Sequence, residues 1–298
     1  MKKLTALILF LLPVFVFAQQ TDTTNLLKTL ESETGDSLAT QYTRGTFKTT
    51  RLINAHSIEN LGKNVLDIKI SHRFGTLNTG FYELFGLDNA SIRIGGDYGI
   101  TDWLMVGLGR SSFEKQYDGF LKAKLIRQST GQKSTPISLG VFVGMYVNTL
   151  KWTDTINAEK FSSRVSYVTQ LLIARKFSEG LSIQISPSVV HYNFVTVDGD
   201  PNNIFAIGFG GRQKLGKRVS FNVEYYYQVG SKLTGSENAL SVGFDIETGG
   251  HVFQLIFTNS TGIAENQYIG KTTGKWGDGD IHFGFNIARV FNLGKKKS

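Results

Sequence analysis

A strict alternation of apolar and polar residues runs through most of this chain. In residues 64–74, the apolar residues Leu66, Ile68 and Ile70 alternate with charged and hydroxyl-bearing residues, and the same pattern recurs in later segments. Successive side chains of a β-strand point to opposite faces, so each of these segments has one apolar and one polar face as a strand. A helix needs a period of 3.6 residues instead. The pattern therefore predicts an all-β protein.

Twelve segments carry this alternation. Most of them exceed the roughly five or six residues typical of strands in soluble proteins. They approach the roughly nine to eleven residues with which a tilted strand crosses a membrane. The predicted strands are 64–74, 90–100, 102–111, 117–128, 136–148, 162–176, 181–194, 203–214, 219–230, 238–248, 251–259 and 279–293.

The connections between these segments alternate in length along the chain. Short connections lie at 100–102, 129–135, 177–180, 215–218 and 248–250, and longer ones lie at 75–89, 112–116, 149–161, 195–202, 231–237 and 260–278. Outer-membrane barrels have short periplasmic turns and long outer loops. A soluble sandwich or jelly roll also has alternating strands, but long strands and polarised loop lengths count against it. We therefore predict a closed antiparallel transmembrane β-barrel of about 12 strands.

The N-terminus has the pattern of a targeting segment. Lys2 and Lys3 precede an apolar run that ends at the cleavage pattern Val16-Phe17-Ala18, so residues 1–18 are predicted to be a secretory signal peptide. Residues 19–63 form a predicted periplasmic N-terminal segment or partial plug, ahead of the barrel at 64–293 and a basic tail at 294–298. Three arrangements stay open for the N-terminal segment: it hangs free, folds into the lumen or binds a partner.

Two stretches resemble a known family. Residues 46–59, TFKTTRLINAHSIE, are followed by LDIKISHRFG at 66–75, and both are similar to the domain-of-unknown-function family 5777 of outer-membrane β-barrels from Bacteroidota. The segment YGITDWL at 98–104 is also similar to it. The likeness covers roughly residues 40–293. It implies the barrel fold and a location in the outer membrane of a diderm bacterium, with the N-terminus periplasmic. It brings no activity, substrate or catalytic residue.

Charged residues of the polar parity should face the barrel lumen. The candidate lumen-lining residues are Lys69, Arg73, Arg93, Asp97, Lys122, Lys124, Arg164, Arg212, Glu224, Asp245 and Glu247. The basic members lie mainly on the first eight predicted strands, and acidic members gather on the ninth and tenth. One interpretation is a polar channel that weakly favours anions. The other is a closed barrel whose opposite walls form ion pairs across the lumen, because charges removed from water need partners.

No residue constellation predicts catalysis or a cofactor. The chain has no cysteine, which excludes disulfides, zinc–thiolate sites and thiol catalysis. Its five histidines lack the spacing of a metal site. A barrel lipase needs a serine beside a histidine, but Ser186 and Ser188 have the opposite parity to His191. No nucleic-acid-binding motif accompanies the basic charge, so no nucleic-acid partner is expected.

The sequence leaves three functions, in order of preference. The first is a narrow channel or transporter-like barrel for small polar solutes. The second is a non-conducting structural or assembly protein that acts with a periplasmic protein through residues 19–63. A membrane enzyme is a distant third, and we predict no catalytic, cofactor-binding or metal-binding residue. The expected partner in each case is outer-membrane lipid.

Overall fold

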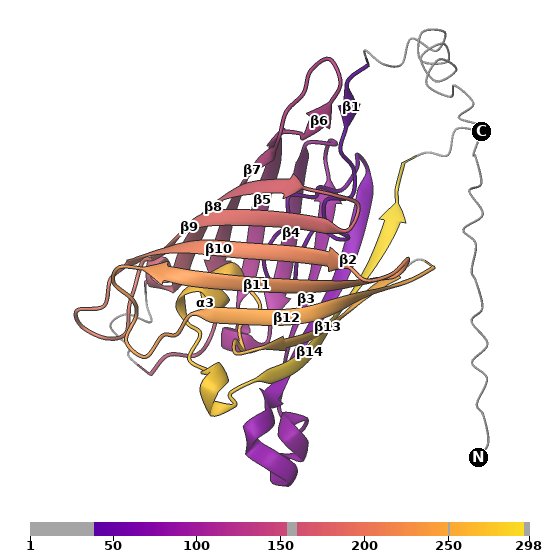
Figure 1. Cartoon of the computed structure of the whole chain (residues 1–298). Helices are drawn as coiled ribbons and strands as arrows, with labels where there is room; N and C mark the ends of the chain where they lie inside the picture. The colour runs from indigo at the N-terminus through magenta and orange to yellow at the C-terminus, as the bar shows by residue number, and fades with distance from the viewer. Residues whose placement is uncertain (1–38, 154–159, 250, 295–298) are drawn as a thin grey trace, which may run out of the picture.

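The computed structural model describes residues 39–153, 160–249 and 251–294, and within them twelve strands form a closed antiparallel barrel (Figure 1). The predicted signal peptide, residues 19–38 and most of the basic tail lie outside the described residues. The first barrel strand, β2, pairs with the last, β14, and closes the ring. The barrel strands are β2 (Val65–Thr76), β3 (Ala90–Gly99), β4 (Leu104–Ser111), β5 (Tyr117–Ile126), β7 (Ser138–Val147), β8 (Val165–Lys176), β9 (Leu181–Tyr192), β10 (Asn203–Lys214), β11 (Val219–Val229), β12 (Ala239–Thr248), β13 (His251–Thr258) and β14 (His282–Asn292).

The predicted fold class is confirmed, because each predicted segment overlaps one barrel strand. Short turns and long loops alternate around the ring, and the barrel therefore has a turn end and a loop end. At the turn end, β1 (Gln41–Tyr42) pairs with β6 (Ser129–Thr130). The loops hold η2 (Leu77–Gly86), η3 (Phe113–Lys115), η4 (Phe161–Arg164), α3 (Glu265–Gly270) and η5 (Trp276–Asp278). Within the described ranges, no helix has the length and apolar character to cross a membrane.

The outer face of the barrel is apolar and carries aromatic residues near both ends. At the loop end, the exposed aromatic residues on the strands are Tyr117, Tyr167, Phe205 and Tyr227. At the turn end, exposed aromatic residues include Trp103 and Phe177, next to the ends of β4 and β8, and Phe291 on β14. The guanidinium groups of Arg175 and Arg289 lie 5.0 and 5.1 Å from the ring centroids of Phe177 and Phe291. Two aromatic girdles around an apolar band are typical of a barrel that spans a membrane.

The core of the molecule lies inside the barrel. Inward-facing wall residues such as Phe142, Leu172 and Ile204 are completely buried. They form one apolar cluster with Leu52 from the segment before β2 and with Ile269 from the loop before β14. Two parts of the chain outside the strands therefore fill the lumen, one from each end of the barrel.

Candidate functional site: an occupied lumen

A hairpin formed by residues 50–57, which we call the lumen hairpin, lies inside the barrel. The backbone N–H of Ser57 donates to the Thr50 carbonyl at 3.0 Å, and that of Leu52 donates to the Ala55 carbonyl at 2.8 Å. These bonds place Ile53 and Asn54 at the tip. After the hairpin the chain returns to the turn end, where β2 begins at Val65. Because both ends of the hairpin leave through the turn end, withdrawal in that direction requires no threading.

The carboxylate of Glu224, on β11, holds the tip of the lumen hairpin. Its oxygens accept hydrogen bonds from three successive backbone N–H groups, at 3.2 Å from Ile53, 3.1 Å from Asn54 and 3.0 Å from Ala55. The side chain is only 2% exposed. Hydrogen bonds to an ionised acceptor are stronger than those between neutral groups. Glu224 is therefore the charged wall residue that binds the backbone N–H groups at the hairpin tip.

Side chains of other strands bind the hairpin carbonyls. The Lys122 ammonium donates to the carbonyl of Ser57 at 3.0 Å and to that of Glu59, just beyond the hairpin, at 2.6 Å. Side-chain amides of Gln184, Gln254 and Asn286 donate to the carbonyls of His56, Leu52 and Ile53 at 2.8, 2.8 and 2.9 Å. Backbone polar groups removed from water must find partners. Here the barrel wall supplies them, from strands on several sides of the lumen.

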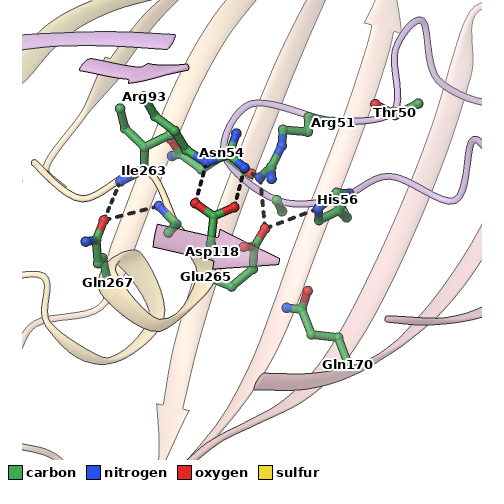
Figure 2. Close-up of polar contacts among 12 residues, drawn as sticks. Thr50, Arg51, Asn54, His56, Arg93, Asp118, Gln170, Ile263, Glu265 and Gln267 are labelled. Atoms are coloured by element: carbon green, nitrogen blue, oxygen red, sulfur yellow. Dashed lines mark hydrogen bonds and ion pairs between the residues drawn. The ribbon is translucent and has the colours of Figure 1, made fainter. Parts of the chain in front are cut away.

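The second insert is α3, which enters the lumen from the loop end with all six residues buried. The side-chain carbonyl of Gln267 accepts the N–H groups of Ile263 and Ala264 at 3.3 and 3.4 Å and caps the start of the helix. Figure 2 shows the Glu265 carboxylate directed at the lumen hairpin. Its oxygens lie 2.8 Å from a guanidinium nitrogen of Arg51 and 2.7 Å from the Tyr146 hydroxyl. The two inserts thus meet at a buried ion pair.

His56 lies beside this ion pair and is completely buried. Its ring centroid is 4.4 Å from those of Phe120 and Phe142, and its Nε2 is 3.6 Å from the nearer Glu265 oxygen. Neither ring nitrogen has a hydrogen-bond partner among the described residues. Burial, together with the neighbouring cations Arg51 and Lys122, holds the pKa of His56 well below its usual range. The imidazole is therefore neutral while the hairpin occupies the lumen.

The structure places most of the predicted lumen-lining residues inside the barrel. Eight of them are buried inward-facing residues: Lys69, Arg73, Arg93, Asp97, Lys122, Arg212, Glu224 and Asp245. Lys124 and Glu247 lie partly buried toward the turn end, where they pair with Glu59 at 3.3 Å and Lys48 at 2.5 Å from the N-terminal segment. Arg212 donates to the Ser220 hydroxyl at 3.0 Å, and Asp245 accepts from Gln254 at 2.7 Å.

Ion pairing inside the barrel differs from the expected pairing across the lumen. Lys69 on β2 pairs with Asp97 on the adjacent β3 at 2.5 Å. Arg93 on β3 pairs with Asp118 on β5, two strands away. Among the remaining inward-facing charges, Arg73, Lys122 and Glu224 bind the lumen hairpin. The wall charges are therefore satisfied locally or by the lumen hairpin, which occupies space across which opposite walls would pair.

One predicted lumen-lining residue needs correction. Arg164 does not line the lumen: it lies in η4, just before β8, where its guanidinium donates to the Leu150 carbonyl at 2.6 Å and lies 4.4 Å from the centre of the Trp152 ring. The alternation of polar residues continues on the N-terminal side of Val165, where β8 begins, so the predicted strand started too early. The predicted long connection 260–278 is a loop at the loop end, but its residues 263–270 fold back and are buried within the barrel.

Sequence reasoning missed the hairpin geometry and the role of Glu265. Residues 50–57 turn back on themselves in a hairpin, which the sequence did not predict. One signal was present in the sequence. Residues 46–59 combine apolar and polar residues without the alternation of a strand, yet carry the strongest family resemblance. Such a stretch needs partners from elsewhere in the chain, and the lumen wall provides them.

A closed barrel with an apolar outer band and a polar, occupied lumen defines a membrane-bound β-barrel protein. A family model described as a membrane bound beta barrel domain, the domain-of-unknown-function family 5777, matches residues 47–291. The chain belongs to this family, and the matched region includes the lumen hairpin.

Solved structures of outer-membrane porins and channels are similar to this chain at low sequence identity. The NanC porin matches with a TM-score of 0.48 and 8% identity, covering 76% of this chain and 98% of the porin. The KdgM porin has a TM-score of 0.45, 8% identity and the same coverages. An outer membrane channel from Pseudomonas putida F1 has a TM-score of 0.43 and 14% identity, covering 78% of this chain and 98% of the channel. The comparison with curated proteins found no match.

Proposed function

We propose that this protein is a gated channel of the outer membrane for small polar solutes, and that the lumen hairpin is its gate. The hydrogen bonds between the barrel wall and the hairpin support this proposal, above all those from three backbone N–H groups to Glu224. Water can replace the hairpin at Glu224, Lys122 and Gln184, because these groups hydrogen-bond equally well to solvent. Withdrawal of the hairpin then leaves hydrated wall groups at the turn end rather than an apolar void, and α3 must also shift before the passage is continuous.

The proposal includes an orientation. Short turns of outer-membrane barrels face the periplasm, and long loops face the outside of the cell. The lumen hairpin joins the barrel at the turn end, and in this orientation it withdraws toward the periplasm. The gate is then controlled from the periplasmic side, where Gln41 and Tyr42 of β1 are exposed.

A non-conducting barrel is the second candidate function, and one observation favours it. Apolar residues of the hairpin and of the α3 loop, such as Leu52 and Ile269, pack into one cluster with Phe142 and Leu172 of the wall. Apolar packing of this kind stabilises a permanent filling. In that role the barrel presents residues 39–45, most of which are exposed, to a periplasmic partner, while the buried residues 50–58 are withheld from it.

A reversible tether distinguishes the two functions. The Leu52 side chain fills the space beside Gly210 on β10, and the chain has no native cysteine, so the double variant L52C/G210C offers one disulfide between hairpin and wall. We expect solute efflux from vesicles containing this variant to stop after oxidation and to resume after reduction. The single variants L52C and G210C control for the substitutions themselves. Equal efflux in both redox states would show that the hairpin is not the gate. No efflux in any state, also with E224A added, would support the non-conducting barrel.

A further inference from the structure

The loop between β2 and β3 exposes a group of large apolar side chains, which we call the aromatic knuckle. It consists of Phe81, Tyr82, Leu84, Phe85 and Leu87, which are 79%, 95%, 46%, 50% and 44% exposed. Contiguous exposed apolar groups on a protein surface mark interaction sites. In Figure 1, η2, which carries most of the knuckle, projects beyond the end of β2, away from the lumen and its inserts. Its surface is therefore separate from the site described above.

The aromatic knuckle is fastened to the barrel. The Leu77 N–H donates to the Ile281 carbonyl at 2.8 Å, and the Asn78 amide donates to the Asp280 carboxylate at 2.7 Å, both in the neighbouring loop. At its base Gly86, with a φ of 86°, packs directly against Gly75, where a Cβ on Gly86 would collide with the Gly75 backbone. The exposed side chains are thus held in place on a fixed base.

The backbone of the knuckle adopts a costly conformation. Leu84 and Phe85 have φ angles of 47° and 56°, in the left-handed region that side-chain-bearing residues rarely occupy. Strained backbone persists where the surroundings compensate for it. Here two consecutive apolar side chains in this strained conformation remain about half exposed, at 46% and 50%. A surface that receives them provides the compensation that water does not.

The lipid-facing side of the barrel leads directly into the knuckle. Phe74, on the outer face of β2, stacks on Phe283 of β14 with ring centroids 5.8 Å apart and rings within 3° of parallel. Phe257 of β13 extends this aromatic group, 5.5 Å from Phe283. The knuckle begins a few residues after Phe74 and lies at the loop end, as do the girdle residues Tyr117 and Tyr227. It therefore extends an apolar face that already contacts lipid.

We propose that the aromatic knuckle is a lipid anchor, inserted at the boundary between headgroups and acyl chains of the leaflet on the loop side of the barrel. Aromatic side chains concentrate at this boundary, where apolar ring and polar edge are both accommodated. Glu83 and Asp88, the acidic residues of the loop, then face the headgroups and water. Insertion fixes the depth and tilt of the barrel at β2. This inference is independent of gating.

Site-directed fluorescence in vesicles tests the anchor. Because the chain has no cysteine, F81C can carry a single polarity-sensitive fluorophore in phosphatidylcholine vesicles. V143C, on the lipid face, is the positive control, and S231C, in a different long loop, is the aqueous control. We expect a lipid that carries a spin label near its headgroup to quench the fluorophore at F81C several-fold more than the fluorophore at S231C. Aqueous iodide should quench S231C several-fold more than F81C. Iodide quenching of F81C equal to that of S231C, without lipid quenching, would overturn the proposal.

A second copy of the chain is the competing occupant of the knuckle. One combined result would assign the surface to self-association and reject the anchor. The fluorophore at F81C would be shielded both from iodide and from lipid spin labels, and a bifunctional thiol reagent would cross-link unlabelled F81C into a dimer. Heat-modifiable gel migration confirms that each variant is a folded barrel before it is measured. A label at Phe81 also replaces one knuckle residue. L87C, at the other end of the knuckle, therefore provides a second position and should show the same quenching pattern.

Discussion

A guanidinium nitrogen of Arg51 lies 2.8 Å from the Glu265 carboxylate, although the two residues are 214 positions apart in the chain. Both are nearly buried, with side chains 4% and 2% exposed. Arg51 arrives from the turn end on the lumen hairpin, and Glu265 arrives from the loop end on α3 (Figure 2). The pair therefore links structures on the two sides of the membrane through the middle of the barrel.

Breaking this pair should release the hairpin. In R51M the Glu265 carboxylate stays buried and keeps only the Tyr146 hydroxyl as a close partner, which should cost about 3–5 kcal/mol. Release is measured as the labelling rate of a thiol at position 55, where Ala55 is 3% exposed, so A55C is the reporter. We expect R51M to accelerate labelling, and the double change R51M/E265Q to recover part of the loss. Purely additive effects of the two substitutions would contradict a direct coupling.

Acidification should open the gate through His56. Its pKa is lowered in the closed state and returns to about 6.5 when the hairpin reaches water, so the closed state binds fewer protons. The contribution of neutral His56 to closure is then fully present above about pH 6.5 and is lost as the pH falls below that value. Each pH unit below it can remove up to about 1.4 kcal/mol. The measurement is solute efflux against pH.

The groups that face His56 decide the control for this experiment. The positive charges of four residues disfavour protonation of His56: Arg51, Lys122, Lys69 and Arg93. The Glu265 carboxylate is the nearby anion that would pair with a protonated His56. H56Q removes the imidazole and leaves Glu265 in place, so its efflux profile should be flat around pH 6.5. A profile in H56Q like that of the unmodified protein would assign the pH response to another group.

Loss of the Glu224 carboxylate should favour the open state. E224Q keeps the size of the side chain but removes the charge that three N–H groups share. A hydrogen bond to a charged group contributes about 1.5–3 kcal/mol, which corresponds to an increase in the open fraction of roughly tenfold or more. Efflux rates measure the increase. The matched control is E179Q, at an exposed turn, which should behave as the unmodified protein. An unchanged rate in E224Q would remove Glu224 from the gate.

The proposed orientation predicts which residues are reached from outside the cell. S231C and D198C, in long loops at the loop end, should react with a membrane-impermeant thiol reagent on intact cells. Q41C, exposed at the turn end, should react only after the outer membrane is permeabilised. The buried residues 263–270 of the last long loop should resist surface protease. Labelling of Q41C alone on intact cells would reverse the orientation.

The strands were predictable because their signal is local. Leu66, Ile68 and Ile70 alternate with polar neighbours whatever the rest of the chain does, and parity alone placed Lys69 and Arg73 inside the barrel. The ends of the strands have a weaker signal. Arg164 was misplaced because the alternation of polar residues continues on the N-terminal side of β8.

The hairpin was not predictable in its geometry because its stability is not local. The Glu224 carboxylate that holds Asn54 is 170 positions away, and the Asn286 amide that binds Ile53 is 233 positions away. Neither contact leaves a periodic trace in residues 50–57. The same holds for Glu265, which has the sequence context of an ordinary loop residue but is buried against Arg51.

The lumen hairpin also bears on how the ring is completed. Asn54 at its tip accepts from Arg73 of β2 at 2.8 Å, and the adjacent Ile53 carbonyl accepts from Asn286 of β14 at 2.9 Å. These two strands are the first and the last of the barrel, and their pairing is the seam. A ring that closed around an empty lumen would leave both side chains without these partners. The hairpin tip therefore bridges the seam from inside the lumen, and its withdrawal removes one contact from each of the two strands that close the ring.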